Sequence, residues 1–364
     1  MKIWTNGPVL SIFPAATDAY FFDRSGRFFA TWEDGWFISF GLSGRTIARR
    51  WQGSRRQLRA LKPAEILHLD EKSKRVLQAA YSTAEAGEKL WFGRALTYDR
   101  AQDIQRFRAA YHPVGILPPD QYGACVVQVT EGCGWNRCHF CSFYRGQTYR
   151  LKDPHDLKGH IERIADFFGD GLSLRRSIFL GEANAFGAPL DHLVSAMETA
   201  LQKLVPRMGP FRGFYSFSEG SAGSCHQASE FRMLARLGLK RIYYGLETGQ
   251  AALRKTLGKP GSLEAIAESI ENAKAAGVRA AVILLAGTGG RAWAKQHIEE
   301  SVRFIKRLPL DQSDILFVSP LYGRDGTGET PLAARDMEQQ EDYLRQELAR
   351  KVRVAPYDIR EFIY

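Results

Sequence analysis

Six short apolar runs recur between residues 124 and 320, and this recurrence constrains the fold more than any other feature of the chain. Each run is rich in β-branched or aromatic residues, as in buried parallel strands. Helical patterns separate the runs, which indicates right-handed βαβ units. The sequence therefore predicts a partial (β/α)6 barrel of the TIM type, with an open doubly wound sheet as the alternative. The runs lie at 124–130, 177–182, 211–218, 240–247, 279–287 and 314–320.

The segments on either side of these runs have a different character. Residues 1–120 begin with aromatic-rich runs separated by turn signals and continue with helical patterns, which predicts a small N-terminal α+β accessory domain. Residues 323–364 follow a glycine-rich loop and contain one charged helical pattern, which predicts a C-terminal helical extension. The expected barrel domain is thus 121–322.

Composition and charge narrow the class of protein. The 364 residues are 45% hydrophobic and 25% charged, which is typical of a soluble globular protein. No long apolar run predicts a membrane span, and the N-terminus does not resemble a secretory signal, so we expect a cytoplasmic protein. The net charge of +10 is compatible with a nucleic acid, a nucleotide or another acidic ligand, and it is equally compatible with a solvated basic face.

Three of the five cysteines are crowded into one short segment. Cys133, Cys138 and Cys141 follow the first predicted strand, whereas Cys125 lies within it and Cys225 is distant in sequence. Loops at the C-terminal ends of barrel strands carry active sites, so these three thiols indicate a metal centre. Three thiolates are one short of a closed zinc or iron–sulfur site, which leaves His139, Cys225 or an added ligand for the fourth position.

The cysteine segment resembles the radical S-adenosylmethionine (SAM) superfamily. Its spacing is C-x4-C-x2-C, one residue longer in the first gap than the commonest spacing of that family. Four further segments are similar to family motifs, three of them at predicted strand ends and the fourth twelve residues after Glu247. They are Gly181-Glu182, the signature at 245–248 that contains Glu247, the basic Lys259, and the glycine-rich turn that starts at Gly287.

The resemblance implies one [4Fe–4S] cluster held by Cys133, Cys138 and Cys141, with SAM bound at the open iron. It further implies that Gly181 and Glu182 receive the methionyl ammonium and that Lys259 receives the methionyl carboxylate. Glu247 is expected near the ribose or the methionyl part of SAM. The remaining implied contacts are adenine contacts from Phe140 and the turn at Gly287, and ribose contacts from Ser218 and Glu219.

The chemistry implied by the resemblance is oxygen-sensitive and needs an electron donor such as flavodoxin or ferredoxin. One electron cleaves SAM into methionine and a 5′-deoxyadenosyl radical, which abstracts hydrogen from a substrate, expected to be a small molecule. Cys225, His226 and Tyr244 are candidate catalytic residues, and Cys225 is hypothesised to donate a hydrogen atom. Candidate pocket-lining residues near strand ends are Tyr215, Glu219, His226, Tyr244 and Tyr322.

Two other functions remain open at this point. The first is a radical SAM enzyme that modifies RNA, which the basic N-terminal segment and its aromatic residues favour. Those aromatic residues are Trp32, Trp36, Phe37 and Trp51. The second is a non-catalytic binding protein with a structural metal site.

Overall fold

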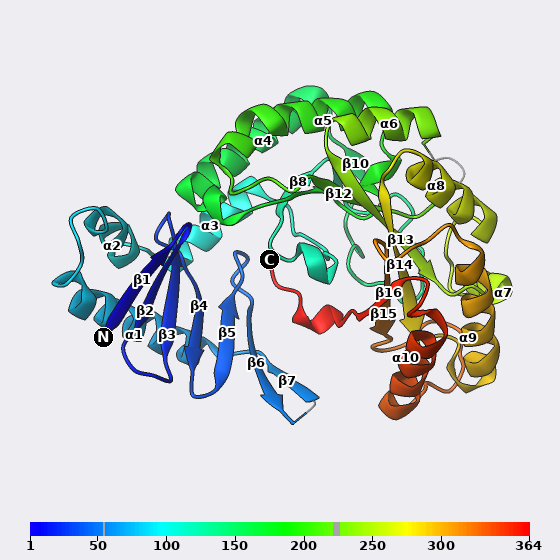
Figure 1. Cartoon of the computed structure of the whole chain (residues 1–364), viewed down its shortest axis with the longest axis horizontal. Coiled ribbons are helices and arrows are strands. Elements are labelled where there is room, and N and C mark those ends of the chain that lie inside the picture. The colour runs from blue at the N-terminus through cyan, green and yellow to red at the C-terminus, as the bar shows by residue number, and fades with distance from the viewer. Residues whose placement is uncertain (54, 221–225) are drawn as a thin grey trace.

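The chain folds around two seven-stranded sheets of opposite kind. The computed structural model describes residues 1–53, 55–220 and 226–364. One sheet is an antiparallel meander and the other is fully parallel, and a two-stranded ladder lies beside the parallel sheet. Figure 1 shows the meander at the left and the parallel sheet with its helices at the right, with the C-terminus between them.

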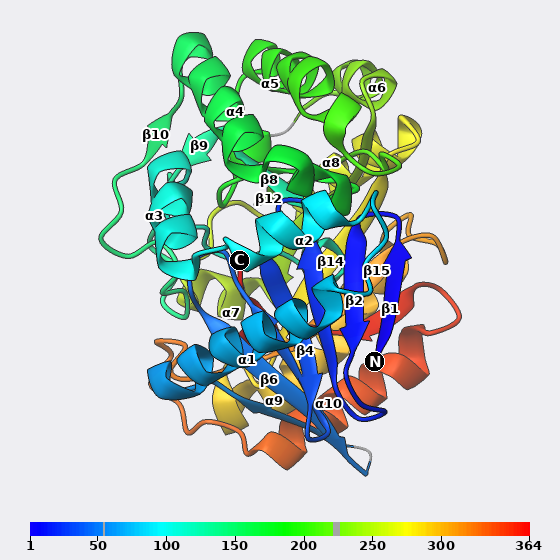
Figure 2. The ribbon, with the colours of Figure 1, turned by 90° about the vertical axis from the view of Figure 1, so that its left-hand side faces the viewer.

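The N-terminal sheet joins its strands in sequence order. One face of this sheet packs on the helices α1 and α2, and Figure 2 shows these helices in front of the sheet, on the side away from the parallel sheet. Leu10, Tyr20, Phe28, Leu77 and Phe92 belong to the core between these two layers. The elements are β1 (Lys2–Asn6), β2 (Val9–Phe13), β3 (Ala19–Asp23), β4 (Phe28–Glu33), β5 (Trp36–Phe40), β6 (Thr46–Gln52), β7 (Arg55–Arg59), α1 (Pro63–Tyr81), α2 (Lys89–Leu96) and α3 (Arg100–Ala110).

The parallel sheet has the order β16-β15-β14-β13-β12-β11-β8 and is covered on its outer side by helices (Figure 1). The strands are β8 (Cys125–Gln128), β11 (Ile178–Gly181), β12 (Phe214–Ser218), β13 (Leu239–Glu247), β14 (Arg279–Ala286), β15 (Ile315–Pro320) and β16 (Arg353–Pro356). The helices are α4 (Pro154–Phe168), α5 (Leu190–Lys203), α6 (Ala228–Arg236), α7 (Ala251–Thr256), α8 (Leu263–Ala275), α9 (Gly290–Arg307) and α10 (Ala334–Leu348). Single 3₁₀ turns occur at Pro119–Gln121, Gly169–Leu174, Ala185–Gly187, Val205–Arg207 and Ile359–Glu361. The predicted fold class, a partial TIM-type barrel beside a small α+β domain, is confirmed.

The parallel sheet contains one strand more than the six that the sequence predicts. The extra strand, β16, pairs with β15 from Ile315↔Arg353 to Val318↔Pro356. It follows α10 within the segment predicted as a helical extension, so that segment completes a further βαβ unit. The strand is short and its side chains are exposed or half-buried, so it carries no apolar run that would identify it in the sequence.

The C-terminal segment joins the two edges of the partial barrel. The hydroxyl of Tyr364 accepts a hydrogen bond from the Val126 amide at 2.8 Å and donates to the carbonyl of Ala124 at 3.2 Å. The hydroxyl of Tyr357 donates to the carbonyl of Leu117 at 2.8 Å. These bonds attach the segment after β16 to β8 and to the linker before it, across the open side of the sheet.

Arg27 fixes the N-terminal domain to the barrel. Its guanidinium pairs with Asp103 of α3 at 2.8 Å and donates to the carbonyl of Phe168 at the end of α4 at 3.1 Å. Arg27 and Asp103 are both buried. Arg27 and Asp103 both belong to residues 1–120, so the bonds that join the two parts are those from Arg27 to the carbonyls of Phe168 and Phe167 at the end of α4. Among the described residues, no helix is both long and apolar enough to span a lipid bilayer.

Candidate active site

The three clustered cysteines lie on a loop that is closed at its base. Strand β9 (Thr130–Glu131) follows β8 directly and pairs antiparallel with β10 (Arg150–Leu151), so residues 132–149 form the loop. The carboxylate of Glu131 accepts hydrogen bonds from Arg150 at 2.9 Å and from the buried Lys152. Burial opposes ionisation of Glu131, but these two cations outweigh it and lower its pKa to about 2. Glu131 is therefore ionised at neutral pH and holds the two ends of the loop together.

All three thiols face one cavity at the C-terminal ends of the barrel strands. This cavity has a volume of about 230 Å³, and its lining includes Cys133, Cys138 and Cys141. Burial is the main cause that raises the pKa of the Cys138 thiol to about 11, and it also raises that of Cys141. Among the described residues, the lining contains no histidine and no further cysteine. From the described residues, the cavity thus offers three sulfur ligands; Cys225, the other alternative for a fourth thiolate, lies outside those residues.

His139 lies between two of the cysteines in sequence but does not line the cavity. Its backbone amide donates to the carbonyl of Leu257 at 3.0 Å. Its ring lies beside the backbone of Gly258 and Gly326, where a β-carbon would touch it. The alternative of His139 as a fourth ligand therefore has no support in this arrangement.

A buried ion pair shares the cavity with the thiols. The ammonium of Lys259 lies 3.2 Å from the carboxylate of Glu247, and both side chains are about nine-tenths buried. Gly245 makes this pair possible, because a β-carbon there would lie 2.8 Å from Glu247 Oε1 and 2.9 Å from Lys259 Nζ. Glu247 itself has a φ of 62°, an uncommon conformation for a residue with a side chain, so the strand end is shaped around this pair.

Arg254 organises the segment that carries Glu247 and Lys259, and the sequence analysis did not single it out. The side chain is buried and donates to the carbonyls of Leu246 at 2.7 Å and Pro260 at 2.8 Å. It thereby bridges the residue before Glu247 and the residue after Lys259. Nothing in the local sequence distinguishes this arginine from an exposed residue of a short helix.

The remaining lining of the cavity is largely apolar and aromatic. Phe140, Ser218, Glu219 and Tyr322 line it, as do side chains from the ends of β12, β14 and β15. The amide of Glu219 donates to the Asn184 side chain at 3.0 Å, which fixes the backbone after β12. The cavity therefore combines three thiols and one ion pair with apolar walls.

Comparison with known proteins identifies this part of the chain. Residues 127–305 match the family model described as the radical SAM superfamily. These residues form a radical SAM domain. A curated relative, the hopanoid C-3 methylase of Methylococcus capsulatus (strain Bath), is 24% identical over 212 residues. The match covers 57% of this chain and 36% of that protein, so the chain spans about a third of the relative's length.

Solved structures of radical SAM proteins also resemble this chain. Coproporphyrinogen III oxidase from Escherichia coli has 13% sequence identity and a TM-score of 0.48, over 67% of this chain and 56% of that one. A radical SAM methyltransferase from Sphaerobacter thermophilus has 12% identity and a TM-score of 0.42, over 96% of this chain and 77% of that one. Enzymes of this family use a [4Fe–4S] cluster and SAM.

Glu182 of the radical SAM domain is buried and does not line the cavity. Its buried carboxylate accepts hydrogen bonds from the Gly115 amide at 3.0 Å, the Gln128 side chain at 2.9 Å and the Tyr144 hydroxyl at 3.0 Å. Burial raises the pKa of this carboxyl group, and the three donors favour its charged form. Neither Gly181 nor Glu182 lines the cavity. Glu182 instead ties the cysteine loop, through Tyr144, to β8 and to the linker from the N-terminal domain.

The glycine-rich turn at Gly287 is also outside the cavity lining. Its amide donates to Gln340 of α10 at 2.8 Å, and a β-carbon at Gly287 would lie 2.5 Å from the sulfur of Met337. The amide of Gly289 donates to Asp325 at 2.6 Å. The close approach that requires glycine at 287 is therefore made to α10.

Of the candidate catalytic residues, the two that the structure describes, His226 and Tyr244, do not line the cavity. The hydroxyl of Tyr244 contacts Ser269 of α8 at 3.2 Å, in the layer between sheet and helix. His226 is buried beside Phe186, whose carbonyl lies 2.9 Å from His226 Nε2. Cys225 lies outside the described residues. Tyr215 does not line the cavity, whereas Tyr322 does.

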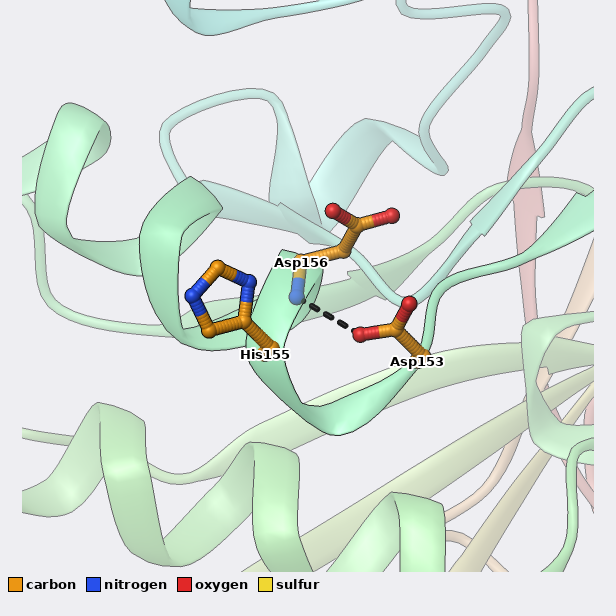
Figure 3. Close-up of side chains that lie close together, drawn as sticks. All are labelled: Asp153, His155 and Asp156. Atoms are coloured by element: carbon orange, nitrogen blue, oxygen red, sulfur yellow. Dashed lines mark hydrogen bonds between the residues drawn. The ribbon is translucent and has the colours of Figure 1, made fainter.

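A second group of potential metal ligands lies at the start of α4 and has a structural explanation. Asp153, His155 and Asp156 bring one ligand atom each within 4.8 Å of the others. Figure 3 shows how these three side chains lie. Asp153 accepts a hydrogen bond from the Asp156 amide at 2.9 Å, so it is the N-cap of α4, with Pro154 at the first helical position. Asp156 pairs with Arg150. The carboxylates of Asp153 and Asp156 therefore stabilise the helix start and the base of the cysteine loop.

Proposed function

We propose that this chain is a radical SAM enzyme in which Cys133, Cys138 and Cys141 bind one [4Fe–4S] cluster and SAM occupies the adjoining cavity. The observation that supports this most is the joint lining of one cavity by three thiols and the Glu247–Lys259 pair. A structural zinc site is disfavoured because such sites are closed by four protein ligands.

The donor set suits an iron–sulfur cluster with one open iron. Thiolates are the ligands that hold such clusters, and the three sulfur atoms come from one loop with a fixed base. Because burial raises the pKa of Cys138 and Cys141, these thiols are protonated without metal, and metal binding would release their protons. Cys125 is buried in β8 and is not part of the lining, so one cluster is expected.

The charged pair suits the methionyl group of SAM, which carries one positive and one negative end. Lys259 is placed to bind a carboxylate and Glu247 to bind a cationic group. Phe140, Ser218 and Glu219 line the same cavity and are proposed to contact the adenosyl part. The carboxylate of Glu182 is already satisfied by three donors, so we assign it to positioning the cysteine loop.

When both are bound, the cluster and SAM supply the one-electron cleavage that yields a 5′-deoxyadenosyl radical and the abstraction of hydrogen from a substrate. The chain's own contribution is binding, orientation and exclusion of water. Phe140, Phe217, Ile283 and Leu285 give the cavity apolar walls, and such walls protect a reactive species from side reactions. An electron donor of the ferredoxin or flavodoxin kind completes the proposed reaction.

Anaerobic reconstitution with iron and sulfide tests this proposal. We expect a brown protein with about four irons per chain and release of 5′-deoxyadenosine when dithionite and SAM are added. Cys138→Ala should lower this release at least 100-fold. Cys125→Ala is the matched control, because Cys125 is a buried thiol outside the cavity, and it should retain release per folded protein.

A colourless, zinc-loaded protein without SAM cleavage would contradict the proposal. About eight irons per chain would contradict the single cluster. An equal loss of 5′-deoxyadenosine release in the Cys125 and Cys138 variants would contradict the proposal that the cysteine loop binds the cluster.

A further inference from the structure

A second cavity lies between the two domains, far from the thiols along the barrel strands. It has a volume of about 650 Å³ and is lined by the antiparallel sheet on one side and by the start of the barrel on the other. Gly123 and Arg175 line it and precede β8 and β11, so it adjoins the N-terminal ends of these strands. The cysteine cavity is at their C-terminal ends. We call this second cavity the interdomain cleft.

The sheet side of the interdomain cleft carries aromatic side chains on the face that the helices α1 and α2 do not cover. Trp32, Phe37 and Arg49 are direct neighbours across β4, β5 and β6. The rings of Trp32 and Phe37 are 6.1 Å apart. Trp32 is 42% exposed, and Trp51, two residues beyond Arg49 on β6, is 64% exposed. With strands about 4.8 Å apart, this row spans roughly 10 Å. The guanidinium of Arg56 lies 4.8 Å from the centre of the Trp51 ring and covers one face of it.

The interdomain cleft also has an excess of positive charge. Its lining contains five arginines and two carboxylates, and the carboxylates of Asp23 and Glu361 are already paired with Arg27 and Arg56. The other arginines are Arg49, Arg50 and Arg175. In the part of the chain that the structure describes, none of these three has a carboxylate within 4.0 Å.

Two of these arginines face the cleft from different domains. Arg49 donates to the Ser39 hydroxyl at 3.0 Å and to the Glu361 carbonyl at 2.7 Å, so both partners are neutral. On the barrel side, Arg175 Nε is buried and has no hydrogen-bond partner. Arg49 and Arg175 are half-buried, and the carboxylates that act on them, those of Glu361 and Asp23, are paired with Arg56 and Arg27. An anionic ligand would give these two cations a direct charged partner.

We propose that the interdomain cleft binds a segment of single-stranded RNA, with bases stacked on Trp32 and Trp51 and phosphates near Arg49 and Arg175. Aromatic platforms beside cationic side chains are the means by which proteins hold unpaired nucleotides. The Ser39 hydroxyl accepts a hydrogen bond from Arg49 and can still donate one of its own. A ribose 2′-hydroxyl could accept that hydrogen bond. This inference goes beyond the proposed SAM chemistry, because the interdomain cleft contains none of the cofactor-binding residues.

Fluorescence anisotropy with a labelled 12-nucleotide single-stranded RNA of mixed sequence tests the inference on the reconstituted full chain. Trp51→Ala should weaken binding about tenfold through loss of one stacking platform. Trp4→Ala is the matched control. Trp4 is 55% exposed and lies on the same sheet face, but on the edge strand β1 and outside the cleft. It should leave the affinity unchanged.

Salt dependence tests the phosphate contacts. Two arginine–phosphate contacts, from Arg49 and Arg175, predict about sevenfold weaker binding at 200 mM than at 50 mM salt. Arg175→Gln should reduce the slope of log K against log salt by about 0.7, since one contact is lost. Arg108→Gln, an exposed arginine outside the cleft, should leave the slope unchanged.

Several results would overturn the inference. They are absence of RNA binding at 50 mM salt, equal effects of Trp51→Ala and Trp4→Ala, and equal affinity for duplex RNA. Equal affinity for single-stranded DNA, or full competition by an equimolar mononucleotide, would overturn the assignment to an RNA strand. Release of 5′-deoxyadenosine by the Trp51 variant should match that of the unaltered protein, so that the two proposals fail or succeed separately.

Discussion

The cysteine cavity and the interdomain cleft lie at opposite ends of the same barrel strands. They differ in whether their cationic side chains are paired with carboxylates. In the cysteine cavity, the cation Lys259 is paired with Glu247 at 3.2 Å within largely apolar walls. In the interdomain cleft, Arg49 and Arg175 have no carboxylate within 4.0 Å among the described residues, and the exposed Trp32 and Trp51 line the same cleft. An internally paired site suits a ligand that carries both charges, whereas an unpaired cationic site suits a polyanion.

The two regions also differ in how they are built. The cysteine cavity is made by loops that follow successive strands of one sheet, so its residues meet wherever that sheet forms. The interdomain cleft exists only because Arg27 and the C-terminal segment hold two domains in one arrangement. The following predictions test this contrast, beginning with the largest expected effect.

The largest effect is expected from removing the ion pair between Glu131 and Lys152 at the base of the cysteine loop. Glu131→Gln leaves the buried Lys152 without its counter-charge and should cost about 3 kcal/mol of unfolding free energy. Chemical denaturation measures this change, and the lifetime of the bound cluster should shorten with it. The double variant Glu131→Gln with Lys152→Gln should recover part of the loss, because it removes both charges.

The same carboxylate, that of Glu131, makes the stability of this end of the barrel depend on pH. The pKa of Glu131 is lowered to about 2 in the folded protein, so its contribution is complete above its unfolded pKa near 4.5. It is lost as the pH falls from about 4.5 toward 2, where the carboxylate takes up a proton. The free energy of unfolding should fall less steeply over this pH range in the Glu131→Gln variant than in the unaltered protein. An equally steep fall would contradict the assignment of this pH dependence to Glu131.

A smaller effect is expected from crowding the ion pair. Gly245→Ala places a β-carbon within 3 Å of both charged groups and should cost about 2 kcal/mol of SAM binding, a weakening of about thirtyfold. Equilibrium dialysis with labelled SAM measures the affinity. Gly87→Ala is a suitable control, since no atom lies within 4 Å of a β-carbon there. Unchanged SAM affinity in the Gly245 variant would show that SAM does not bind at the Glu247–Lys259 pair.

The smallest effect is expected from salt on SAM binding. Raising salt from 50 to 200 mM should change SAM affinity less than about twofold, because the buried pair is screened little. The same change should weaken RNA binding at the interdomain cleft far more. If salt changed the affinities for SAM and for RNA to a similar extent, the proposed electrostatic difference between the two cavities would be wrong.

Local sequence patterns could predict the strand-end residues of the cavity and could not predict which way each side chain turns. Glu247 and Lys259 follow one strand and the cysteines another, so a parallel sheet brings them to one end. Glu182 stands in a similar motif, yet its carboxylate faces Gly115, Gln128 and Tyr144, which come from three separate segments. That orientation depends on how these segments pack together, which no local pattern contains.

The remaining differences from expectation have the same origin. Strand β16 has exposed and half-buried side chains and joins the sheet by backbone hydrogen bonds to β15, so its sequence carries no strand signal. Tyr244 and His226 follow the expected positions near strand ends but face the helix layer. The aromatic residues of the N-terminal segment were visible in the sequence, whereas their arrangement on one open sheet face required the register of β4, β5 and β6.

Electron–nuclear double resonance of the reduced protein tests the central claim most directly. With SAM labelled by ¹⁵N and ¹⁷O in its methionyl group, the account predicts hyperfine coupling of these nuclei to the cluster, because one iron is left open by the three cysteines. Lys259→Ala should weaken SAM binding, so that a higher SAM concentration is needed for the same coupling. A reduced [4Fe–4S] signal that shows no coupling to saturating labelled SAM would contradict the account.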